Sequence, residues 1–153
     1  TAKGKSVLII HYADYLKFIA KTYFDWDGQK NEKGRSLLQW LGTDKIRAIN
    51  NDFWVTAVTN LIEVLKDDYD YFFIPDCRFP NEVNYLITKF GIDKIILVKI
   101  HRKDFISPLT KEQQEHPSET SLDNYPANYY IEVGEGLDKV KQEVKNFLAF
   151  YNM

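Results

Sequence analysis

The chain has 153 residues, 44% of them apolar and 27% charged, which is typical of one globular domain with a single core. A formal net charge of −2 argues against a general nucleic-acid-binding protein, because such proteins usually carry a basic excess. The single cysteine excludes an intrachain disulfide and no apolar run is long enough to span a membrane, so the sequence predicts a cytoplasmic protein.

Apolar periodicity divides the first half of the chain into one strand and several helices. The predicted elements are a strand at 7–11, a helix at 12–24, a polar loop at 25–33, a helix at 35–49 interrupted near Gly42, and a helix at 52–66. The last of these is the clearest, because Trp54, Val58, Leu61 and Leu65 form an apolar stripe at helical spacing.

The second half alternates strands with helices and contains one long polar segment. It predicts a strand at 71–75, a helix at 81–90 that ends at Gly91, strands at 94–100 and 128–133, and a helix at 136–151. Strands separated by helices favour a three-layer α/β/α fold with a small, mainly parallel sheet, formed by one domain over residues 1–153. The polar segment at 101–125 is predicted to be a lid or binding loop.

A carboxylate and a guanidinium directly follow the most apolar strand. Asp76 and Arg78 come just after Tyr71–Ile74, at the end of a strand where ligands bind in open α/β sheets. The pair suits work on a phosphate group, and the alternative is an Asp76–Arg78 ion pair that caps the sheet. Asn81 and Glu82 either support Arg78 or simply begin the next helix.

Four segments, in this order, carry a resemblance to a known family. They are Leu37–Asp44, Asn51–Val55, Ile74–Glu82 and His116–Asp123. Together they resemble phage-type deoxynucleoside monophosphate kinases, which belong to the P-loop nucleoside-monophosphate kinases. The resemblance implies transfer of the γ-phosphoryl group from ATP to a deoxynucleoside monophosphate with Mg²⁺, and a P-loop NTPase-like fold.

The glycine-rich phosphate loop of such kinases is not found in its usual form. Gly4-Lys5-Ser6 has only three residues before it, and the β-branched run Val7–Ile10 follows where a helix should begin. We interpret Gly4-Lys5-Ser6 as the turn before the second strand of the family. The expected fold therefore lacks its first βα unit, and the unpaired strand edge that results favours a homodimer.

The family resemblance assigns acceptor-site roles to residues of the first two helices. Asp14 is expected to contact the sugar or base and Lys17 the phosphate, although Asp14 is equally suited to be an N-cap. Arg35 is expected to clamp the acceptor phosphate, with a solvated helix arginine as the alternative.

Further substrate contacts are expected from the interrupted helix and the one after it. Gln39 is expected to contact a base edge through its amide, and the alternative is an exposed helix position. Gly42-Thr43 is expected to let the ligand approach the backbone closely, and the alternative is a simple helix break. Trp54 is the candidate for stacking on the base, at a rim position, and its alternative is ordinary core packing.

The catalytic residues implied by the resemblance are Asp76, Arg78 and Arg102. Asp76 is expected to hold Mg²⁺ through water or to orient the phosphate-binding groups, and Arg78 to neutralise charge during transfer. Arg102 and the segment that contains Glu119 form the predicted lid, with Glu119 as a substrate-binding residue, unless residues 118–121 only begin a helix. Arg47 is expected to pair with Asp44 or Asp52.

Two other functional classes compete with a kinase. A non-catalytic nucleotide-binding or regulatory module, or an inactive fragment, would account for the missing P-loop. A PD-(D/E)xK nuclease is disfavoured because Leu97 stands where that metal site needs an acid two residues before Lys99. No metal-ligand set is predicted, since His11, His101 and His116 lack ligand spacing.

Overall fold

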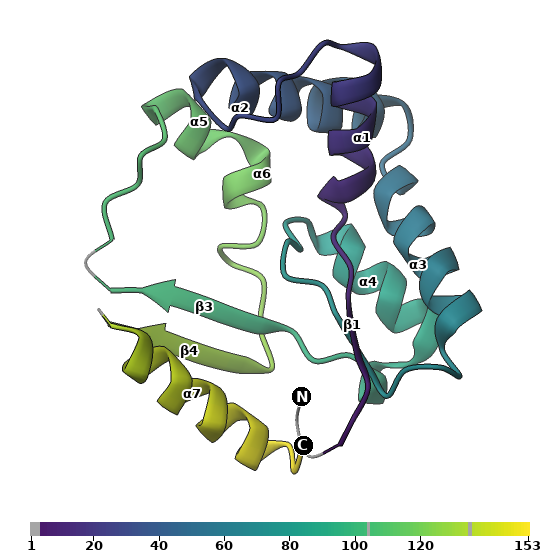
Figure 1. Ribbon diagram of the computed structural model, residues 1–153, viewed down its shortest axis with the longest axis vertical. Helices are drawn as coiled ribbons and strands as arrows, with labels where there is room; N and C mark the ends of the chain where they lie inside the picture. The colour runs from purple at the N-terminus through teal and green to yellow at the C-terminus, as the bar shows by residue number, and fades with distance from the viewer. Residues whose placement is uncertain (1–3, 104, 135) are drawn as a thin grey trace.

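The computed structural model describes residues 4–103, 105–134 and 136–153 (Figure 1). The elements in chain order are β1 (Val7–Ile9), α1 (Ala13–Tyr23), α2 (Glu32–Gln39), the π-helix η1 (Trp40–Arg47), α3 (Phe53–Leu65), β2 (Tyr71–Phe73), α4 (Pro80–Phe90), the 3₁₀ turn η2 (Ile92–Lys94), β3 (Val98–Arg102), α5 (Lys111–Glu115), α6 (Pro117–Thr120), β4 (Tyr129–Val133) and α7 (Leu137–Phe150).

The order of strands and helices predicted from the sequence is confirmed, with shorter strands. The helix expected to be interrupted near Gly42 continues from α2 into the π-helix η1, and the polar segment at 101–125 contains the short helices α5 and α6. No helix in the described part of the chain is long and apolar enough to cross a bilayer.

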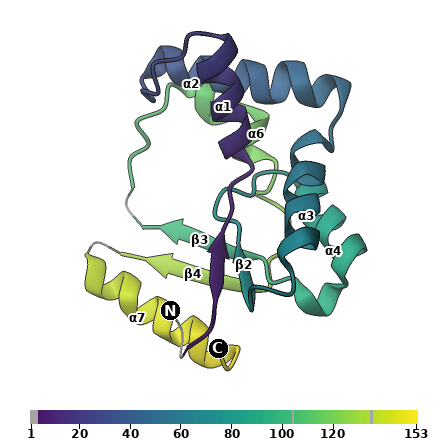
Figure 2. The same cartoon turned by 45° about the vertical axis from the view of Figure 1, so that its right-hand side comes forward.

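The strands form two parallel pairs, and all four strands can be followed in Figure 2. β1 pairs with β2 in the register Val7↔Tyr71, and β3 pairs with β4 in the register Val98↔Tyr129. The expectation of one small sheet is therefore wrong for the described residues, although both pairs are parallel as predicted. Both edges of each pair are unpaired, since no further strand joins either pair within these residues.

The main core lies between the β1–β2 pair and the helices α3 and α4. Its most buried members are seven residues from these elements and from the end of β1: Ile10, Tyr12, Trp54, Val55, Val58, Ile62 and Leu86. The helix α3 supplies four of them, because its helical spacing places these side chains on one face. The predicted stripe is confirmed at Trp54 and Val58 and is wrong at Leu61, whose side chain is exposed. This packing fixes the turn after β2 against the start of α4.

The predicted three-layer arrangement is incomplete in the described residues. Figure 1 shows the helix α7 lying along β4. The Phe147 ring on α7 contacts the Tyr129 ring on β4, with ring centroids 5.3 Å apart. Large apolar side chains nevertheless remain exposed on both strand pairs: Ile9, Phe73, Ile100 and Tyr130. β1 and β2 are apolar throughout, a pattern typical of strands that are covered on both faces, whereas β3 and β4 also carry charged residues.

Candidate functional site

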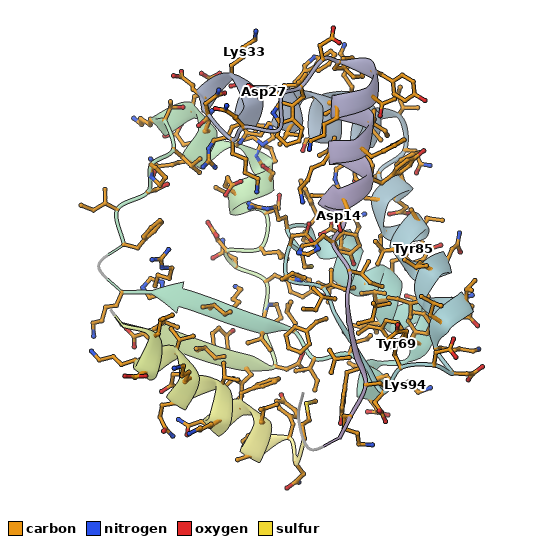
Figure 3. All side chains as sticks on the ribbon, in the orientation of Figure 1. Asp14, Asp27, Lys33, Tyr69, Tyr85 and Lys94 are labelled. Carbon is orange, nitrogen blue, oxygen red and sulfur yellow. The ribbon has the colours of Figure 1, made fainter. Side chains whose placement is uncertain are left out.

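The carboxyl ends of β1 and β2 meet at one corner of the fold. The Ile10 N–H donates to the Phe73 carbonyl oxygen at 2.9 Å, and beyond this bond both chains turn away from the pair. β1 leads into α1, and Figure 3 shows Asp14 at the end of α1 next to β1. β2 leads into the turn that carries Asp76 and Arg78, so residues far apart in the sequence share this corner.

Asp76 caps α1 from the neighbouring strand. Its Oδ1 accepts from the Tyr12 N–H at 3.0 Å and its Oδ2 from the Ala13 N–H at 2.9 Å. Neither Tyr12 nor any other residue of α1 supplies a side-chain cap of its own. The carboxylate therefore satisfies two of the free N–H groups at the N-terminus of α1, where the helix dipole also favours a negative charge.

Asp14 lies beside this cap and pairs with two side chains rather than with the backbone. Its carboxylate accepts from Lys17 Nζ at 3.0 Å and lies 3.2 Å from His11 Nδ1. Burial raises the pKa of Asp14, but the hydrogen bond and the charge of Lys17, together with His11, outweigh this effect. The pKa of Asp14 is therefore below its usual value. The interpretation of Asp14 as the N-cap is wrong, because Asp76 takes that role.

Arg78 connects the turn after β2 to the helix α6. Its Nη1 donates to the Ser118 carbonyl oxygen at 2.9 Å and lies 2.5 Å from Glu119 Oε1. The Arg78 side chain is 48% exposed and that of Glu119 is 26% exposed. The structure thus brings together a predicted catalytic residue and a predicted lid residue, while Asp76 and Arg78 each have a different partner.

A buried ion pair supports the backbone of Arg78. Glu82 Oε2 accepts from the Arg78 N–H at 2.7 Å and from the Phe79 N–H at 3.1 Å, and Glu82 Oε1 pairs with Arg47. Glu82 therefore supports Arg78 and also starts α4, as the two sequence interpretations allowed. The expected partners of Arg47, Asp44 and Asp52, are wrong, because Arg47 at the end of η1 faces α4.

A polar cavity of about 170 Å³ lies between the α2–η1 segment and the α5–α6 segment. Gln39 lines this cavity, and its Nε2 donates to the Gln113 carbonyl oxygen at 3.4 Å. On the same lining, His116 Nε2 lies 3.4 Å from Asp44 Oδ1. The sequence analysis did not select Gln113, and it placed His116 only in the resembling lid segment at 116–123 and not as a metal ligand.

Two other expected substrate residues on these helices lie outside the cavity lining. Thr43 is half-buried on η1. Arg35 is also half-buried, and its Nε donates to the Lys30 carbonyl oxygen at 2.8 Å. The observed contact of Arg35 is therefore with the loop before α2.

Trp54 is a core residue. Its side chain is 3% exposed, and its Nε1 donates to the Gly42 carbonyl oxygen at 3.0 Å. The expected rim position is wrong, because α1 and η1 pack over the face of α3 that carries this ring. The close approach at Gly42 also serves packing, since a Cβ there would lie 2.8 Å from Leu16 Cδ2.

Arg102 lies on the other strand pair. It ends β3, with its guanidinium carbon 4.1 Å from the centroid of the Phe105 ring, and lines a cavity of about 480 Å³ next to α7. Its observed neighbours are thus β4 and α7 rather than the α5–α6 segment.

Gly4-Lys5-Ser6 forms a turn before β1, as predicted. Lys5 Nζ pairs with Asp70 Oδ1 at 2.9 Å, and the Ser6 N–H donates to Asp70 Oδ2 at 2.8 Å. These contacts lie at the amino ends of β1 and β2, whereas Asp76 and Arg78 lie at the carboxyl ends. Lys5 therefore has no access to a phosphate bound at Arg78.

Comparison with protein-family models matches residues 5–144 to the family described as deoxynucleotide monophosphate kinase. A search of curated proteins gives no match. The matched range covers both strand pairs, the Asp76–Arg78 turn and the α5–α6 segment. Because the family model matches most of its length, the chain belongs to the deoxynucleotide monophosphate kinase family.

Proposed function

We propose that this chain forms the acceptor side of a deoxynucleoside monophosphate kinase, with the acceptor phosphate bound at Arg78. The family match supports a nucleotide substrate and a phosphoryl donor of the ATP type. The corner where β1 and β2 end would hold the monophosphate, and the α5–α6 segment would act as the lid that excludes water from the transfer.

The observation that carries this proposal is the environment of the Arg78 guanidinium. The Arg78 side chain is half-exposed beyond the carboxyl end of β2, and its partner is the Glu119 carboxylate on the short helix α6. The backbone N–H of Arg78 is held by Glu82. A guanidinium that already binds a carboxylate has the geometry to bind a phosphate, whose oxygens it contacts in the same way.

Other residues of the corner suit the remaining parts of the substrate. We assign Lys17, which is partly exposed on α1, to the phosphate, and Asp14 beside it to a sugar hydroxyl. The polar cavity next to Gln39 would take the base, and Thr43, which does not line it, would reach the substrate only from the following turn. Arg35 would reach the phosphate only after leaving the Lys30 carbonyl oxygen.

The family implies Mg²⁺ and ATP, and Asp76 is the carboxylate that fits such a metal. In the described residues no three His, Cys, Asp or Glu side chains group as a metal site. Mg²⁺ in kinases is usually held by one or two carboxylates together with substrate phosphates. Asp76, whose oxygens already accept two backbone N–H bonds, suits a contact through water, where the metal would neutralise phosphate charge.

A non-catalytic nucleotide-binding module is the second candidate function. The 153 residues contain no G-x-x-x-x-G-K-[ST] pattern, and Lys5 is paired with Asp70 at the opposite end of the strands. We therefore expect this chain alone to bind a deoxynucleoside monophosphate and to transfer little phosphate from ATP. Transfer would need a donor-phosphate loop beyond these residues.

Titration calorimetry with each of the four deoxynucleoside monophosphates tests the proposal. At least one should bind, the matching deoxynucleoside without phosphate should bind much more weakly, and Arg78→Ala should lower the affinity about tenfold or more. Lys66→Ala, which removes a surface ion pair with Glu63, is the matched control and should change nothing. Absence of heat with all four monophosphates would reject the proposal.

A transfer assay with ATP separates the two candidate functions. Transfer well above background would favour the kinase, and its absence beside monophosphate binding would favour the non-catalytic module. Arg102→Ala should leave monophosphate binding unchanged in either case, because Arg102 lies on the other strand pair. Homodimerisation through the open strand edges stays a prediction, and a monomer in sedimentation experiments would oppose it.

A further inference from the structure

We propose that Arg47 is a positioning residue for Arg78. Acting through Glu82, it fixes the turn after β2 so that the Arg78 guanidinium faces its ligand. The phosphate role of Arg78 rests on the proposed function, but the positioning itself can be tested without any ligand.

The first step is the contact between Glu82 and the turn. One carboxylate oxygen, Oε2, accepts two consecutive backbone N–H groups, those of Arg78 at 2.7 Å and Phe79 at 3.1 Å. Two such bonds to one oxygen fix the peptide planes on both sides of Arg78, and hence the direction in which its side chain leaves the backbone. The direction observed is toward Ser118 and Glu119.

The second step is the contact between Arg47 and Glu82. The other carboxylate oxygen, Oε1, pairs with the Arg47 guanidinium, and the two side chains are 7% and 2% exposed. Burial of Glu82 raises its pKa, and the Arg78 N–H and the Arg47 charge oppose that effect. Arg47 therefore stabilises the ionised carboxylate on which both backbone bonds depend.

The third step is the fixed position of Arg47 itself. Its Nη1 donates to the Asn51 carbonyl oxygen at 3.0 Å and lies 3.4 Å from Asn81 Oδ1, and its guanidinium carbon is 4.0 Å from the centroid of the Phe79 ring. These contacts come from the loop before α3, from α4 and from the turn. Only a planar group with several donors can make them at once, so a lysine would not replace this arginine.

A purely stabilising role would not need an ion pair at this place. Replacing a buried pair by uncharged side chains of similar size is often neutral for stability. The particular contribution of Arg47 and Glu82 is that their contacts converge on the backbone of Arg78 and Phe79. Small displacements of a binding group are costly for function even when the fold survives.

The test is a double-mutant cycle between Arg47→Lys and Arg78→Ala, read by the affinity for a deoxynucleoside monophosphate. Arg47→Lys should weaken binding about tenfold in the native background and have almost no effect in the Arg78→Ala background. Equal weakening in both backgrounds would overturn the positioning role. The Lys66→Ala control should leave the affinity unchanged in both.

Amide hydrogen exchange without ligand supplies the second readout. Arg47→Lys should speed exchange at the Arg78 and Phe79 amides about tenfold, while the core amides of Val83 and Leu86 keep their native rates. A uniform increase at all four would show a general loss of stability and reject the proposal. If the native chain binds no monophosphate, the proposed function fails, and this exchange pattern still decides the positioning role.

A second variant covers the case in which Arg47→Lys does not fold. The double variant Arg47→Met/Glu82→Met removes both charges, so no unpaired charge stays in the core, and it also removes the oxygen that accepts the Arg78 and Phe79 N–H bonds. We expect it to fold and to show the same selective exchange at residues 78 and 79. Native exchange and native affinity in this folded variant would contradict the inference.

Discussion

Arg78 Nη1 lies 2.5 Å from Glu119 Oε1, and this ion pair connects the turn after β2 to the helix α6. The two residues are 41 positions apart in the sequence, and the Ser118 carbonyl oxygen strengthens the link at 2.9 Å from the same Nη1. In the proposed function the guanidinium binds a phosphate, so the Glu119 carboxylate and the substrate compete for one cation. In that case Glu119 occupies the place of the substrate phosphate on Arg78 and does not itself contact the bound substrate.

Removing this competitor should improve substrate binding. Glu119→Gln keeps the size of the side chain but removes its charge, so a monophosphate no longer has to displace a carboxylate from Arg78. A partly exposed ion pair contributes about 0.2–1 kcal/mol, which corresponds to a gain in affinity of up to about fivefold. Calorimetry with the best-binding monophosphate measures this gain.

The matched control for that experiment is Glu115→Gln. Glu115 lies on the adjacent helix α5 and is 3.9 Å from Lys111, so its removal changes the net charge equally without touching Arg78. It should leave the affinity unchanged. A weaker affinity in Glu119→Gln would instead support the direct substrate contact predicted from the sequence.

Asp76→Asn should destabilise the fold, because Asp76 caps α1. The asparagine amide keeps one acceptor oxygen, but its NH₂ group would face the N–H of either Tyr12 or Ala13. Since both groups are hydrogen-bond donors, that N–H would lose its acceptor. We expect a loss of about 1–2 kcal/mol in the free energy of unfolding, measured by urea denaturation. Asp93→Asn, on the exposed turn η2, should lose much less. Unchanged stability in Asp76→Asn would favour a role limited to Mg²⁺.

The strand that carries the site was predictable because its chemistry is local. An apolar run, then Asp76 and Arg78, then a helix start is visible in the sequence, and the parallel pairs follow from the alternation of strands and helices. Arg78 and Glu119 were each selected separately. Their contact was not, because it depends on where α6 packs against the turn.

Arg47 shows why the support of the site could not be predicted. Its nearest acids in the sequence, Asp44 and Asp52, were the obvious partners, yet the π-helix η1 changes which residues share a face. In a π-helix the hydrogen bonds join residues five apart, so Gly42 and Arg47 both lie on the buried side. Predicting the Arg47–Glu82 pair would have required knowledge that η1 is a π-helix and that α4 packs against it. A sequence pattern with a period of 3.6 residues contains neither fact.

Trp54→Ala should cost about 3–5 kcal/mol of unfolding free energy, as for other large aromatic residues removed from a core. The ring is 3% exposed and its Nε1 bond to Gly42 would also be lost. Trp40→Ala, at a 39% exposed position, should cost clearly less. Denaturation curves followed by circular dichroism measure both.

Fluorescence gives an independent check on Trp54. In a variant with Trp26 and Trp40 replaced by Phe, the emission of Trp54 should not change when a monophosphate binds, because both faces of the ring are covered by core residues. Strong quenching on binding would restore the stacking role that the sequence suggested.

Asp70 should make the stability of the fold depend on acid pH. The hydrogen bond from Lys5, with those from Ser6, lowers the pKa of Asp70 from 3.8 to about 2. The pKa of Asp70 is lower in the folded state than in the unfolded state. The contribution of Asp70 to the free energy of unfolding is therefore fully present above pH about 4 and is lost as the pH falls toward 2. The difference in urea midpoint between the native chain and Asp70→Asn should therefore shrink across this range. A constant gap for Asp70→Asn from pH 6 to pH 2 would contradict the linkage.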